Sequence, residues 1–230
     1  MTIILVLVAA LAAIAVWWLS QQRLTEKPWL EQGPAGSFHD TATGVMPAAK
    51  VGLGVFLAVV SSLFALFASA YSMRMHMASD WRSLPVPWLL WPNTGVLFLG
   101  SAAMGWAQAA ARRGRIAGLR TGLLAGGACT VLFLAGQVVA CRQLAAAGFY
   151  MAANPANAFF YLLTALHGLH LLGGLVALGR TGARVLHGTR TGPMVGPMVG
   201  AMVLSVDLCA LYWHFLLLVW LAVFALLLHG

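Results

Sequence analysis

Long uncharged runs are the feature that most constrains what this 230-residue chain can fold into. Six such runs occur, each at least close to the roughly 20 residues that a helix needs to cross a bilayer core about 30 Å thick. The sixth is longer than the others and contains one acidic residue. Only 8% of the residues are charged, whereas a soluble domain carries about 25% charged residues. A water-soluble globule is therefore excluded, and the sequence predicts a polytopic membrane protein.

The runs are expected to be α-helices, because lipid cannot satisfy backbone hydrogen-bonding groups. The predicted fold class is thus all-α, an integral membrane bundle of six transmembrane helices. The last helix is long enough to tilt or to begin below the membrane surface. Small residues are expected to let helices pack closely, namely Gly52, Gly54, Ala58, Gly173 and Gly174. The expected spans run approximately over Ile3 to Ser20, Val51 to Ser72, Trp88 to Ala111, Thr121 to Ala140, Ala158 to Gly179 and Met198 to Leu228.

One sizeable connection interrupts the spans, a segment over 21–50 that contains several proline and glycine residues. We therefore expect an N-terminal transmembrane helix at 1–20, a cytoplasmic loop at 21–50 and a five-helix core at 51–230. The first run lacks the basic leading region and the small-residue cleavage pattern of a secretory signal, so we interpret it as a retained helix. The alternative is an uncleaved anchor outside the functional bundle.

The net charge of +8 is distributed unevenly between the loops. The first, third and fifth expected loops hold ten of the 13 Lys and Arg residues, and the second and fourth hold three. This asymmetry follows the positive-inside rule and places the odd loops in the cytoplasm, with both termini on the outer side of the membrane. The excess of basic residues thus indicates how the chain is oriented in the membrane and does not indicate a nucleic-acid partner.

Asp207 is the one acidic residue of five that falls within an expected span. An ionised carboxylate at that depth is costly unless it is paired, so Asp207 is a candidate functional residue by default. His214 shares its helix face but lies about 10.5 Å further along the axis. Bonds from Asp207 to other helices or subunits are therefore expected. Gln137, Asn93 and Thr94 are further candidates for hydrogen bonds across helices.

His167 and His170 are three residues apart in the fifth expected span, so both face one side of that helix. Together with His214 and Asp207 they admit a His/carboxylate site of the kind that binds non-haem iron or zinc. The competing interpretation is that these side chains hydrogen-bond to other helices and to lipid head groups. The second interpretation is favoured because HxxH alone is a weak signal and no H-E-x-x-H set accompanies it.

Two histidine-containing segments resemble signatures of one family. Residues 159–170, FFYLLTALHGLH, are similar to the F-x-x-T-x-x-H-G-x-H signature of subunit III of haem-copper oxidases. The run Tyr212-Trp213-His214-Phe215, with Trp220, resembles the closing W-Y-W-H-F…W motif of that family. The resemblance extends from about Lys50 to the end of the chain. Several acidic positions of the family are not acidic here, which indicates a divergent bacterial branch.

The resemblance implies a non-redox accessory subunit with no catalytic, metal or cofactor-binding residues of its own. Such a subunit packs directly against oxidase subunit I, accompanies subunit II and small subunits, and binds phospholipid, while haem and copper lie in the partner subunits. The complex would reduce oxygen to water, coupled to proton translocation, and subunit III would protect the catalytic subunit from inactivation during turnover. Interhelical or lipid contacts would then be the role of His167, His170, Asp207, Tyr212, Trp213, His214, Gln137 and Asn93.

Three alternatives stay open. Subunit III-like chains also accompany quinol oxidases and nitric-oxide reductases. A proton-coupled secondary transporter could use Asp207 and the histidines as a relay, although neither the inverted repeats nor the broken helices often found in transporters are visible in the sequence. An independent membrane metalloenzyme would require bound metal in the purified chain.

Overall fold

The computed structural model describes residues 48–77, 81–188 and 197–229. These residues form five helices and no strand. The first expected span and nearly all of the 21–50 loop lie outside the described residues. The helices are α2 (Ala48–Met77), α3 (Leu90–Arg112), α4 (Ile116–Ala146), α5 (Pro155–Gly188) and α6 (Pro197–His229).

Four of the described helices, α2, α4, α5 and α6, are long and apolar enough to cross a membrane. The described part of the chain is therefore all-helical, and its apolar helices are those of a membrane protein. α3 is not among the four, although its 23 residues would extend about 35 Å. Its sequence is less apolar because it includes Asn93, Thr94, Ser101 and Gln108 among many small residues. Six transmembrane helices thus stay a prediction.

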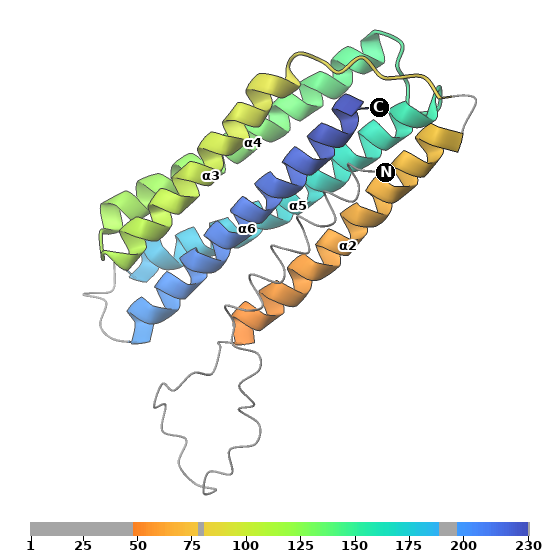
Figure 1. Cartoon of the computed structure of the whole chain (residues 1–230). Coiled ribbons are helices and arrows are strands. Elements are labelled where there is room, and N and C mark those ends of the chain that lie inside the picture. The colour runs from red at the N-terminus through yellow and green to blue at the C-terminus, as the bar shows by residue number, and fades with distance from the viewer. Residues whose placement is uncertain (1–47, 78–80, 189–196, 230) are drawn as a thin grey trace, which may run out of the picture. The chain divides into compact units, whose positions relative to one another are not determined.

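The chain divides into two compact units, Met1–Ala65 and Leu66–Gly230, with the boundary inside α2. In the second unit α3 packs against α4 and α6, and α5 also packs against α4 and α6. These four helices therefore close into a bundle, and Figure 1 shows α3 running beside α4 and α6 running along α5. The predicted five-helix core at 51–230 stays a prediction.

Two glycines turn the chain at the ends of α3 and α4, where φ is positive. Gly114 has φ 66° and Gly148 has φ 88°, values that cost glycine little because it lacks a Cβ. After α3, the amide of Gly114 donates to the carbonyl of Ala111 at 3.1 Å and the amide of Arg115 donates to that of Ala110 at 2.9 Å. These two bonds form a Schellman motif, which fixes the direction of the chain into α4.

The segment after α2 is tied to the start of α5. Asn154, just before α5, accepts a hydrogen bond from the amide of Arg82 at 3.5 Å and donates one to its carbonyl at 2.6 Å. Tyr71 lies edge-on to the rings of Trp81 and Phe159, with centroids 5.0 and 5.5 Å away. These contacts order the connection between the end of α2 and the bundle.

α3 and α4 approach each other along a row of glycines four residues apart on α4. A Cβ built at Gly122 would lie 2.7 Å from the Cβ of Ala107 and 2.9 Å from its Cα and backbone nitrogen. A Cβ at Gly126 would lie 2.8 Å from the Sδ of Met104. Such small residues let helix backbones come close, so van der Waals contact holds α3 against α4.

Of the two adjacent glycines that were expected to permit close packing in α5, only one does so. A Cβ at Gly174 would lie 2.8 Å from Cε1 of Tyr212 and 3.2 Å from Cη2 of Trp213 on α6. Among the described residues, a Cβ at Gly173 would meet nothing within 4 Å, and the same holds for Gly52 of α2, so the expectation is wrong for these two glycines. For Gly173 the reason is geometric, because neighbouring residues of a helix point about 100° apart.

Candidate functional site

A buried aromatic cluster occupies the centre of the four-helix bundle. Trp220 of α6 is fully buried and lies edge-on to Phe133 of α4, with ring centroids 5.0 Å apart. The imidazole of His167 on α5 lies 5.1 Å from the Trp220 ring. The indole N–H of Trp220 donates to the hydroxyl of Thr94 on α3 at 2.9 Å. Trp220 therefore contacts all three of the other helices.

His167 is fully buried and joins α5 to α6. Its Nε2 lies 3.2 Å from the carbonyl oxygen of Leu216, and because a carbonyl only accepts, the imidazole donates from this nitrogen. Phe133 packs edge-on against the same imidazole at 5.6 Å. His167 thus has one ring nitrogen directed at a neighbouring backbone and its ring faces packed against aromatic groups.

A second layer of polar contacts joins α4 to α6 and α3. The indole N–H of Trp213 donates to the hydroxyl of Thr130 at 2.9 Å, and this hydroxyl donates in turn to the carbonyl of Gly126 at 2.8 Å. The amide of Asn93 donates to the carbonyl of Phe133 at 3.1 Å. All these polar groups are buried and bonded, as interior polar groups in proteins generally are.

The remaining histidines contact different partners. His214 Nδ1 is hydrogen-bonded to the hydroxyl of Ser101 on α3. His170 Nδ1 lies 2.8 Å from the carbonyl of Leu166 in its own helix, and the hydroxyl of Tyr212 donates to the carbonyl of His170 at 2.9 Å. These contacts belong to separate places in the bundle.

The structure does not bring the histidines and the aspartate together. In the described ranges, no group of three or more His, Cys, Asp or Glu side chains is placed to hold a metal ion. The hypothesis of a shared metal site for His167, His170, His214 and Asp207 therefore gains no geometric support from these residues. The same-side placement of His167 and His170 is real, but the first points into the bundle core and the second bonds to its own helix.

Asp207 of α6 pairs with Arg112, the last residue of α3. The guanidinium Nε donates to Oδ1 at 3.3 Å and Nη2 donates to Oδ2 at 3.2 Å, which is a two-pronged contact. The side chain of Asp207 is 20% exposed and that of Arg112 is 60% exposed. α6 has 33 residues, so it extends about 50 Å and exceeds a bilayer core of about 30 Å. The excess length lets this ion pair lie at the membrane edge, where the free-energy cost of removing its charges from water is lower.

Gln137 of α4 is buried, and neither atom of its amide group has a hydrogen-bond partner among the described residues. It follows Phe133 by one helical turn and therefore lies next to the aromatic cluster. The side-chain oxygen of Thr164, one turn before His167, is also buried without a partner in the same part of the chain.

Sequence reasoning missed three residues of this core, namely Thr130, Ser101 and Phe133. Thr130 and Ser101 were detectable in principle, because each is a hydroxyl within an apolar helix and must find a partner there. Phe133 carried no such signal, since one aromatic residue in an apolar run resembles any other.

The fold and this core define a class, a polytopic helical membrane protein whose interior polar side chains bond one helix to the next.

No family model matches the chain. Proteins of Mycobacterium bovis and Mycobacterium tuberculosis named probable cytochrome c oxidase subunit 3 are 32% identical over 182 residues, covering 77% of this chain and 86% of theirs. A Synechocystis protein named cytochrome c oxidase subunit 3 is 31% identical, covering 76% of this chain and 72% of its own.

The chain belongs to the cytochrome c oxidase subunit III family. This confirms the resemblance carried by the segments at 159–170 and 212–220.

Proposed function

We propose that this chain is the non-redox accessory subunit III of a haem-copper terminal oxidase in a bacterial inner membrane. The names of its relatives from mycobacteria and from Synechocystis support an oxidase of the cytochrome c type. In this proposal the chain spans the membrane six times, with both termini in the periplasm. It packs directly against subunit I, which holds haem and copper, and subunit II completes the catalytic unit.

The observation that carries the proposal is how the motif residues of this family use their polar atoms. His167, Trp213 and Trp220 each direct a ring N–H at a group on a neighbouring helix. Their role is therefore to hold the bundle together, and the chemistry of the complex belongs to its partners. The same positioning role is proposed for His170, Asp207, Tyr212, His214, Gln137 and Asn93.

The complex would reduce oxygen to water with electrons from cytochrome c and couple this reaction to proton translocation. The proposed contribution of this chain is indirect. It covers one side of the catalytic subunit, binds phospholipid and protects that subunit from inactivation while it turns over. Exposed apolar side chains on the bundle, such as Leu99, Leu124 and Leu169, suit contact with lipid or with an apolar partner.

Deleting the chain from its host is expected to change the lifetime of the oxidase more than its initial rate. Oxygen consumption by membranes of the deletion strain should begin within about twofold of the parent rate, and its half-life during continuous turnover should shorten by about tenfold. Polarographic recording at saturating reduced cytochrome c measures both quantities. Re-expression of the wild-type chain is the control and should restore the lifetime. An unchanged decay in the deletion strain would contradict the proposed role.

A further inference from the structure

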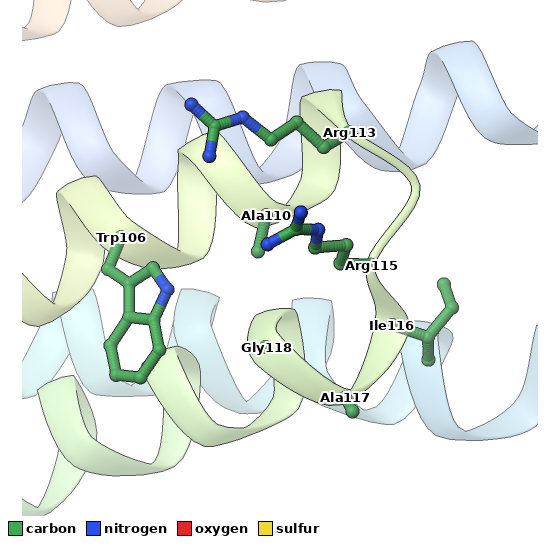
Figure 2. A pocket seen from close by; sticks show the side chains of 7 residues that line it. All are labelled: Trp106, Ala110, Arg113, Arg115, Ile116, Ala117 and Gly118. Carbon is green, nitrogen blue, oxygen red and sulfur yellow. The ribbon is translucent and has the colours of Figure 1, made fainter.

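A pocket of about 460 Å³ lies beside the turn that joins α3 to α4. This volume is within the range of about 300 to 1,000 Å³ that is typical of ligand pockets. Trp106 of α3, Gly118 of α4 and two arginines of the turn, Arg113 and Arg115, are among the residues that line it. Figure 2 shows the guanidinium of Arg115 lying between the turn and the indole of Trp106.

The turn itself holds the two arginines in place. Arg113 and Arg115 flank Gly114, whose φ of 66° allows the two hydrogen bonds of the Schellman motif. The amide of Arg113 also donates to the carbonyl of Ala109 at 3.2 Å. The backbone of both arginines is thus fixed, so binding an anion would order only their side chains.

The charge of this turn is not neutralised by the described part of the chain. Asp207 is the one acidic residue in the described ranges, and its carboxylate is bonded to Arg112. Arg113 and Arg115 are exposed and have no carboxylate partner among the described residues. Two arginines of one turn therefore leave a net positive charge among the residues that line the pocket.

The pocket combines this charge with an apolar level deeper in the membrane. Trp106 is 61% exposed and lies seven residues before Arg113, which is about 10 Å along the helix axis. Tryptophan is enriched where bilayer headgroups meet acyl chains, and arginine forms two parallel hydrogen bonds with phosphate oxygens. The indole, followed by the guanidinium groups towards the end of α3, has the order of apolar and charged parts of a lipid with its phosphate at the surface.

We propose that this pocket binds a phosphate group, held by Arg113 and Arg115 and presented by an anionic phospholipid or by free phosphate. The inference rests on the proposed function only in placing the chain in a membrane as a lipid-binding subunit. It requires no oxidase partner. Lipid binding and the recovery of an oxidase are therefore separate readouts, and either can fail alone.

The test is native mass spectrometry of the full-length chain in detergent, titrated with phosphatidylglycerol and, in parallel, with zwitterionic phosphatidylcholine. The double variant R113Q/R115Q is expected to bind phosphatidylglycerol about tenfold more weakly than the wild type, with little change for phosphatidylcholine. R113K/R115K keeps the positive charges but loses the planar guanidinium fork. Its affinity for phosphatidylglycerol should therefore fall between those of the wild type and R113Q/R115Q. Circular dichroism melting of each variant checks that the fold is retained.

R180Q/R184Q is the matched control. It removes two exposed arginines from α5 near the same end of the bundle, because Leu178 of α5 lies beside Gly127 in the first half of α4. Its affinity for phosphatidylglycerol should stay within about twofold of the wild type, as expected when only diffuse surface charge is lost. Equal losses in the two double variants would overturn the site, and no loss of phosphatidylglycerol affinity in R113Q/R115Q would exclude a lipid headgroup as its ligand.

Phosphorus NMR with inorganic phosphate distinguishes the two sources of the anion. Line broadening by the lipid-free wild type that disappears in R113Q/R115Q would assign the pocket to free phosphate. Arginine-dependent phosphatidylglycerol binding without such broadening would assign it to a lipid headgroup. Absence of arginine dependence in both experiments would overturn the proposal.

Discussion

Replacing Trp220 with alanine is expected to destabilise the bundle by about 3 to 5 kcal/mol, the range for removing a fully buried large aromatic side chain. The indole fills the centre of the bundle and contacts Phe133, His167 and Thr94 on three helices. Lipid does not replace these contacts, because the void would lie inside the protein. Denaturant unfolding of the full-length chain in detergent, followed by circular dichroism, measures the loss.

Two control variants separate packing from hydrogen bonding at this position. Trp220→Phe keeps an aromatic ring but loses the N–H donor to Thr94. Loss of this hydrogen bond should lower the free energy of unfolding by about 1 kcal/mol, and the loss of packing should lower it by a smaller amount. Trp88 is 79% exposed, so Trp88→Ala should change stability by no more than about 0.5 kcal/mol. If Trp220→Ala were no more harmful than Trp88→Ala, the aromatic cluster would not be the core of the bundle.

Replacing Gly122 with leucine is expected to force α3 and α4 apart. The nearest atoms to an added Cβ include the backbone of Ala107, which cannot rotate out of the way. Overpacking of this kind costs up to about 3 kcal/mol, which exceeds the gain of about 1 kcal/mol from the better helix propensity of leucine. A net destabilisation of about 2 kcal/mol should appear in the same unfolding measurement.

Gly95 of α3 provides the matched control for this substitution. A Cβ there would meet nothing within 4 Å, so leucine adds helix propensity without a clash. Gly95→Leu is therefore expected to leave the stability unchanged or to raise it by up to about 1 kcal/mol. Equal destabilisation by Gly122→Leu and Gly95→Leu would show that helix spacing at Gly122 is not tight.

The helices themselves were largely predictable from the sequence. Uncharged runs of about 20 residues leave the backbone no alternative to helix in lipid, and the runs expected from Val51 onward coincide with α2 to α6. α2, α4, α5 and α6 extend beyond their runs at both ends, whereas α3 begins two residues inside its run. An α-helix continues until a breaker such as Gly114 or Gly148 ends it. α3 is the described helix that is not among the candidate membrane spans, since its polar residues lower its apolar character.

The packing partners could not be predicted in the same way. The glycine row at Gly118, Gly122 and Gly126 has the spacing of a close helix contact, yet the prediction named small residues of α2 and α5 and none of these three. A glycine shows its role only when the facing helix is known. The partner of Asp207 was likewise open, because Arg112 is distant in sequence and was assigned to a loop.

In the candidate site, too, the sequence indicated which types of residue matter but not which residues they contact. Polar residues in apolar runs were singled out because each needs a partner there. Asn93, His214 and Asp207 have one on another helix, whereas the amide of Gln137 has none among the described residues. Which helix supplies that partner depends on the arrangement of the bundle, as with Trp213 and Thr130, 83 residues apart. The family could not be inferred from hydrophobic pattern either. It came from the two histidine-containing motifs and is supported by the relatives.

Gentle detergent purification of the tagged chain from its native membrane, with an absorption spectrum and identification of the co-purifying proteins, tests the central claim most directly. The account predicts haem absorbance together with a large catalytic oxidase subunit, both of which are lost when this chain is separated from the particle. A chain that purifies alone, and carries its own metal or supports transport after reconstitution, would contradict the account.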